Sequence, residues 1–159
     1  GPRSVDEVIM AEADDSTTLT VDGYVLDIVP ATGLANRRYI WSEDLQAVFG
    51  GVMTFSGTHV WVADTQSKEE RAAWIANLDA IIERAPKVLV PGHMTLGAPT
   101  GLETVEFTKA YLLAIEEELE NATTSEDLAA AMTARYPDLG MVVALAIGSK
   151  VLTGEMKWG

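Results

Sequence analysis

Short apolar runs separated by turn residues dominate the first third of the chain. Residues 17–21 and 24–29 are rich in β-branched and aromatic side chains, and they flank Asp22-Gly23, a dipeptide typical of tight hairpin turns. Further runs of the same kind lie at residues 38–41, 46–49, 53–55 and 60–63. The pattern predicts roughly five or six short strands, connected mostly by links of hairpin length.

The hydrophobic period changes from that of a strand to that of a helix after Asp64. Ser67 and Glu70 have the spacing of a capping box, in which each side chain accepts a hydrogen bond from an amide at the start of a helix. Apolar side chains then recur at helical spacing, at Trp74, Ile75, Leu78, Ile81 and Ile82. This spacing predicts a helix that continues to about Ala85, ends before Pro86 and buries one face.

The second half of the chain predicts one short strand followed by helices. The apolar run at residues 87–90 fits a short buried strand, and residues 91–101 have the composition of a loop. Helical patterns follow at residues 102–121, 124–134 and 141–152. The glutamates at 116–118 and 120 are expected to form a solvated helix face, and Trp158 is expected to dock on the body of the protein.

Length and charge narrow the class of protein. At 159 residues the chain is long enough for one ordinary domain, which we place at residues 17–159 after an acidic lead-in at residues 1–16. The opening Gly1-Pro2-Arg3-Ser4 resembles the remnant of a cleaved tag. The formal net charge is -13. A surface this acidic repels phosphate backbones, so we expect no nucleic-acid partner.

The chain contains no cysteine. This composition excludes disulfides, thiolate metal sites and a cysteine nucleophile. No apolar run reaches the length of a membrane span, and the first residues lack the pattern of a signal peptide. We therefore expect a cytoplasmic protein with no membrane partner.

Asp64 and His93 are the residues best placed for chemistry, because both follow predicted strands and lie in loops. Asp64 precedes a helix N-terminus; it is either a catalytic carboxylate or the cap of a turn. His93 follows Pro-Gly at the end of a strand, where an imidazole can point into a cleft. His59 alternates with Trp61 on a predicted strand, so it is either a ligand or an ordinary core or surface histidine. Two histidines and a carboxylate could form a zinc site.

Other catalytic classes find little support in the residues. The chain has no Gly-x-Ser-x-Gly nucleophile elbow and neither of the glycine-rich phosphate-binding fingerprints. With 2 histidines and no cysteine, the chain has few of the residues that a Ser/His/Asp or Cys/His triad requires. Metal-assisted hydrolysis is the remaining enzymatic class.

Three segments carry a resemblance to a known family. Val88-Leu-Val-Pro-Gly-His93 resembles the late strand of metallo-β-lactamase-fold hydrolases, whose Pro-Gly-His motif supplies a zinc ligand. Leu26-Asp-Ile-Val-Pro-Ala-Thr-Gly33 looks like the strand and glycine turn before another ligand, and Ala47-Val-Phe-Gly-Gly51 looks like the strand that follows. The resemblance extends over nearly the whole chain from about Thr17.

The resemblance implies a mixed α/β (α+β) fold, the C-terminal half of an αββα sandwich, with an antiparallel or mixed sheet and helices on one face. The family's His-x-His-x-Asp-His loop has no counterpart here. Leu34 and Gly51 stand where the family usually has a histidine and a metal-bridging aspartate. His93 alone carries over as a metal ligand; Asp64 is a possible substitute carboxylate and catalytic group, and His59 is a weaker ligand candidate.

A catalytic zinc needs about three protein ligands and an open position for water. The family resemblance therefore implies a fragment of a zinc-dependent hydrolase of a small-molecule substrate, inactive by itself and without an organic cofactor. An apolar sheet face left by the missing half predicts completion by a homodimer or by an N-terminal half. The alternatives are a metal-free binding or assembly module on the same scaffold, and an unrelated small α/β domain.

Overall fold

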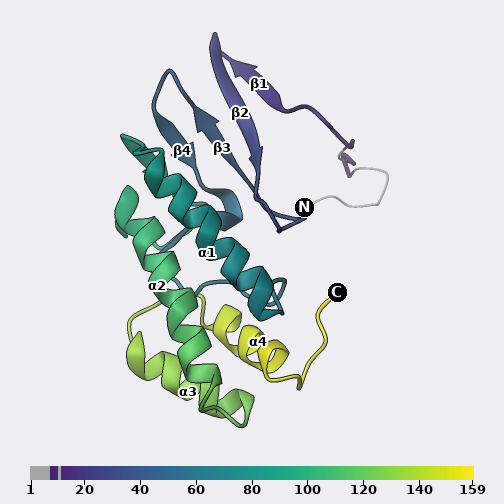
Figure 1. Cartoon of the computed structure of the whole chain (residues 1–159), viewed down its shortest axis with the longest axis vertical. Helices are drawn as coiled ribbons and strands as arrows, with labels where there is room; N and C mark the ends of the chain where they lie inside the picture. The colour runs from purple at the N-terminus through teal and green to yellow at the C-terminus, as the bar shows by residue number, and fades with distance from the viewer. Residues whose placement is uncertain (1–7, 11) are drawn as a thin grey trace.

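A computed structural model describes residues 8–10 and 12–159, so the predicted tag remnant lies outside the described residues. The described chain forms a mixed sheet of five strands in the order β1-β2-β3-β4-β6 (Figure 1). The strands are β1 (Thr18–Val21), β2 (Tyr24–Pro30), β3 (Arg38–Ser42), β4 (Ala47–Phe49) and β6 (Val88–Val90).

The sheet is antiparallel from β1 to β4, and β6 joins β4 in parallel. Asp22 and Gly23 both have positive φ angles, 51° and 85°. Two central residues of this kind give a turn whose twist matches that of the flanking strands, which confirms the predicted hairpin. The parallel pairing of β6 requires the chain to cross over the sheet, and the helix that follows Ser67 makes this crossover.

A second, two-stranded sheet pairs β5 (Phe55–Ser56) with β7 (His93–Met94) in parallel. The prediction of a strand at 53–55 is therefore partly wrong, because Gly51–Met53 form a short 3-10 helix, η2, before β5 begins. The prediction of a loop at 91–101 missed β7. Two-residue strands of this kind depend on a distant partner, and local patterning does not reveal them.

Two further strand predictions need correction. Residues 60–63 form no strand; Val60, Val62 and Ala63 are all buried, so the segment lacks the two-sided alternation of a sheet strand and crosses the interior as irregular chain. The strand at 87–90 exists as β6, but of its residues Leu89 alone is buried. It is an edge strand with one covered face, so the prediction of a buried strand holds only for that face.

Four helices in the described residues confirm the helical predictions. They are α1 (Lys68–Glu83), α2 (Leu102–Leu119), α3 (Ser125–Arg135) and α4 (Val142–Leu152). The capping box of α1 is present in both directions: the Glu70 amide donates to the Ser67 hydroxyl, and the Ser67 amide donates to the Glu70 carboxylate at 2.9 Å. A matching pair at Thr124 and Asp127 starts α3.

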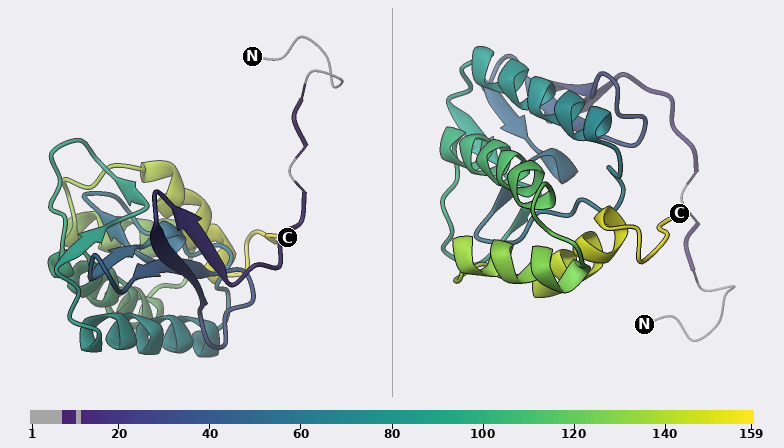
Figure 2. Two further views of the ribbon diagram at one scale, coloured as in Figure 1. Left: turned by 90° about the horizontal axis from the view of Figure 1, so that it is seen from above. Right: turned by 60° about the horizontal axis from the view of Figure 1, so that its bottom comes forward.

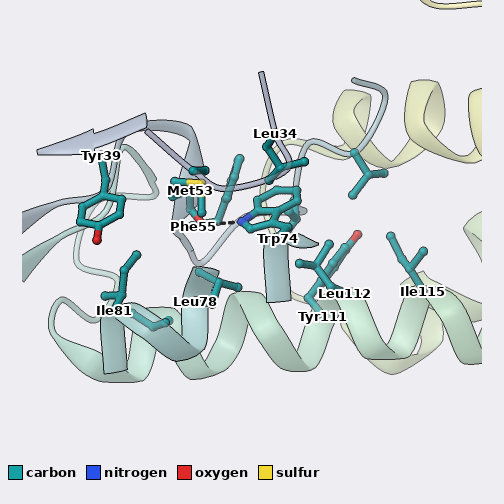
Figure 3. Packing of buried hydrophobic residues seen from close by; sticks show 14 of the residues in the cluster. Leu34, Tyr39, Met53, Phe55, Trp74, Leu78, Ile81, Tyr111, Leu112 and Ile115 are labelled. Carbon is teal, nitrogen blue, oxygen red and sulfur yellow. Dashed lines mark hydrogen bonds between the residues drawn. The ribbon is translucent and has the colours of Figure 1, made fainter. Parts of the chain in front are cut away.

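Helices α1 and α2 lie against one face of the sheet, and α3 and α4 pack beyond its end (Figures 1 and 2). The core lies between these helices and the strands. Trp74, fully buried on α1, points at the strand layer and donates its indole N–H to the Met53 carbonyl at 3.0 Å (Figure 3). Tyr39, Trp41, Val48 and Leu89 face it from the sheet.

Side-chain contacts modify one of the surface predictions and confirm another. Glu116 on α2 pairs with the buried guanidinium of Arg71, so the glutamate run is not a purely solvated face. The docking of Trp158 is confirmed: its ring meets Trp61 edge-on at a centroid distance of 4.9 Å, and its carbonyl accepts from Gln66 at 2.7 Å. No helix among the described residues has the length and apolarity that crossing a membrane requires.

Candidate functional site

His59 is a core residue. It lies outside any strand and is 2% exposed, and its Nδ1 is 2.9 Å from the Tyr111 hydroxyl. Burial lowers the pKa of His59, because the imidazolium loses hydration in the interior. Burial also raises the pKa of Tyr111. The prediction that His59 lies on a strand is therefore wrong. Its Nδ1 makes a hydrogen-bond contact with Tyr111 inside the core.

Asp64 forms a short ion pair with an arginine. Its Oδ1 is 2.7 Å from the guanidinium of Arg37, and its side chain is 28% exposed against 2% for Arg37. The same guanidinium donates to the carbonyls of Val52 and Trp61 and lies over the Trp74 ring, 3.6 Å from its centroid. The carboxylate is therefore neutralised on its buried side by a cation that cannot lose its charge.

Sequence reasoning missed Arg37. It stands beside Arg38 just before a strand, and a pair of basic residues in that position looks like ordinary surface. Desolvation lowers the pKa of Arg37, and the charge of Asp64 acts in the opposite direction. Burial of this one guanidinium depends on contacts with segments 15 to 37 positions away, which local pattern does not encode.

A small polar hollow lies beside this ion pair, at the start of α1. Its volume is about 60 Å³. It is lined by Leu34, Ala35, Asn36, Arg37, Asp64, Thr65 and Glu70. A space of this size holds a water molecule or two, and its lining includes two carboxylates and one guanidinium. It has no room for an organic substrate.

His93 lies in β7, apart from the ion pair. Its ring stacks on Phe55 with a centroid distance of 4.7 Å and an interplanar angle of 12°, and its Nδ1 is buried without a hydrogen-bond partner. The glycine before it is required by packing. A Cβ at Gly92 would lie 1.9 Å from the carbonyl oxygen of Gly51, so the Pro-Gly-His segment and the glycine turn after β4 fit closely together.

Zinc with three protein ligands does not fit the described residues. His59, Asp64 and His93 do not come together, and no group of three or more metal-binding side chains exists in residues 8–10 and 12–159. Leu34, which is buried, offers no donor atom, nor does Gly51. The catalytic role predicted for Asp64 stays a prediction.

Comparison with solved structures identifies the type of fold. No protein-family model and no curated protein matches the sequence. A solved metallo-beta-lactamase family protein from Thermus thermophilus is similar over 89% of this chain and 46% of its own, with a TM-score of 0.60 and 17% sequence identity. A metallo-beta-lactamase from Pontibacter korlensis gives a TM-score of 0.41 and 19% identity over 61% of this chain and 45% of its own.

The described chain therefore has a metallo-β-lactamase-type fold, and the mixed α/β prediction is confirmed. It spans about half the length of the solved structures that it matches. At these levels of identity the likeness concerns the fold, and the activity has to be argued from the residues.

Proposed function

We propose that this chain is a non-hydrolytic assembly module built on the metallo-β-lactamase scaffold. One observation carries the proposal: the carboxylate of Asp64 is already matched by the buried guanidinium of Arg37. To bind a metal ion, Asp64 would have to give up its well-packed ion pair with Arg37.

The electrostatics of the pair disfavour a metal at Asp64. A divalent cation bound there would lie beside the guanidinium, whose charge is fixed and whose surroundings are largely dry. The guanidinium is also held by two backbone carbonyls and by the face of Trp74, so it cannot move aside without breaking those contacts. Asp64 thus positions a structural arginine, and His93 and His59 remain as separate single donors.

The test combines zinc binding with turnover. Native mass spectrometry of the chain with added zinc is expected to show no stoichiometric metal, and ester, lactone and β-lactam substrates are expected to remain intact. His93→Ala is the matched variant, expected to behave as the unaltered chain does in both assays. Turnover that needs zinc and disappears in His93→Ala would contradict the proposal.

A second candidate function is half of a zinc hydrolase, completed by ligands from another polypeptide. The buried, unpartnered Nδ1 of His93 favours it, because unpaired polar atoms in interiors are rare and often belong to functional sites. The same spectra separate the candidates. Zinc held by an assembly and absent from the single chain would support the second and count against the first.

A further inference from the structure

One face of the five-stranded sheet is apolar across its whole width. Cross-strand partners point to the same side, so the register identifies the face: Ile28 pairs with Ile40, Ile40 with Phe49, and Phe49 with Val90. The large apolar residues at these outward positions are Leu19, Val21, Tyr24, Leu26, Ile28, Ile40, Phe49, Val88 and Val90. We call this set the outward face.

Much of the outward face is exposed to solvent, although Ser42 and Ala47, which occupy outward positions at one end of β3 and β4, are buried. Phe49 is 39% exposed, Val88 48% and Val21 51%, while their strand neighbours Val48 and Leu89 are buried against the helices. The described part of the lead-in reaches one corner, where Asp14 and Thr17 share a hollow with Ile28 and Arg38. A contiguous apolar surface on this scale is typical of an interaction site.

We infer that the outward face is the interface through which two copies of this chain form a dimer. The inference gives the proposed assembly function its partner and rests on that proposal. Among the outward positions of the five strands, Arg38 is the one charged residue, in a chain with a net charge of -13. Among the described residues that line the corner hollow, the acidic ones are Asp14 and Asp15.

The distribution of charge favours a second copy. Two molecules that each carry many carboxylates repel one another in most orientations, and they approach best through a surface from which carboxylates are missing. The outward face is such a surface, and a two-fold axis brings it onto itself. Two sheets with the same twist pack face to face with their strands about 30° apart, and their side chains interdigitate.

The size of the face sets the expected strength of the dimer. With strands about 4.8 Å apart and a rise of about 3.3 Å per residue, a face five strands wide covers roughly 300–400 Å² in projection. Two such faces together cover roughly 600–800 Å², which is below the usual range for specific, stable interfaces. We therefore expect a reversible dimer that dissociates on dilution through the micromolar range.

Mass measurement with matched variants tests the inference. Light scattering and sedimentation are expected to give a dimer for the unaltered chain at high micromolar concentration. Phe49→Asp and Val88→Asp are expected to be monomeric and folded by circular dichroism. Val143→Asp adds the same charge at a residue that is 57% exposed on α4, away from the sheet, and is expected to stay dimeric.

Because the chain has no cysteine, one introduced thiol reports the geometry directly. Ile40 lies on β3, the middle strand, close to where a two-fold axis would pass. Mild oxidation is expected to cross-link Ile40→Cys into a dimer much faster than Val143→Cys. A monomer at every concentration, or a dimer that survives both aspartate variants, would overturn the inference. The zinc and turnover assays do not depend on whether the chain is a monomer or a dimer. If no dimer is found, those assays still decide whether the chain is non-hydrolytic.

Discussion

The two faces of the five-stranded sheet are built from the same strands, yet they meet opposite environments. On one face Tyr39, Trp41 and Val48 are buried against α1 and its neighbours; on the other, Phe49 and Val90 remain exposed. Both sets are apolar. Alternation along a strand therefore tells which residues share a face, but here it does not tell which face is the core, because large apolar residues stand on both sides.

The difference between the faces lies in the helices. Burial of apolar surface contributes about 25 cal/mol per Å², so a face stabilises the fold only where another element removes it from water. Trp74 and Leu78 of α1 do this for one face. Substitutions on the covered side should therefore destabilise a single chain, and substitutions on the outward face should change its association.

Trp74→Ala should have the largest effect on stability. It removes a fully buried indole, its hydrogen bond to Met53 and the surface on which Arg37 lies. The expected loss in the free energy of unfolding is about 3–5 kcal/mol, measured by urea denaturation. Val142→Ala, at an exposed position of α4, is the control and should change the same quantity by less than about 0.5 kcal/mol. A small loss for Trp74→Ala would mean that the helix layer is not the main cover.

Asp64→Ala should rank second, with a loss of about 3 kcal/mol, because it leaves the guanidinium of Arg37 buried without its counter-charge. Adding Arg37→Met removes that charge and keeps apolar volume beside Trp74. The double variant should therefore lose less than the sum of the single variants, with a coupling of about 0.5–3 kcal/mol in denaturant titrations. Strict additivity would show that the two side chains do not act as a pair.

A smaller effect should appear on acidification. The pKa of His59 is lower in the folded than in the unfolded chain, so below about pH 6.5 the unfolded state takes up more protons. The stability from neutral His59 is thus complete above that pH and is lost as the pH falls through the folded pKa. Denaturation at several pH values should show this loss, and His59→Gln should reduce it. Tyr111→Phe should retain it, because burial causes the shift; equal slopes in all variants would refute the assignment.

The smallest effect on the stability of a single chain is expected on the outward face. Phe49→Ser should change the free energy of unfolding by no more than about 0.5 kcal/mol when measured at low protein concentration. At high concentration the unaltered chain gains stability from association and the variant does not, so the difference should grow. A large loss that is independent of concentration would show that Phe49 belongs to the core of the single chain.

Much of the fold could be predicted from local pattern. The Asp22-Gly23 hairpin and the capping box at Ser67 are local arrangements of a few residues, and the structure has both of them. The buried segment at residues 60–63 was wrongly predicted as a strand, since an apolar run has the same composition in either state. The candidate site was predicted less well: Asp64 was identified as a carboxylate at a loop, but its partner Arg37 was not.

The sequence by itself determined the helices and the main strands, because caps, turns and hydrophobic period act between near neighbours. The metallo-β-lactamase-type arrangement was implied only by the resemblance of three segments to that family. Tertiary structure decided what distant residues do to one another. It placed Arg37 against Asp64 and Trp74, and it brought the His59 ring within hydrogen-bond distance of the Tyr111 hydroxyl. It also left much of one apolar face of the sheet exposed. Those outcomes depend on which segments meet in space and which groups they shield from water, and a linear pattern does not contain that information.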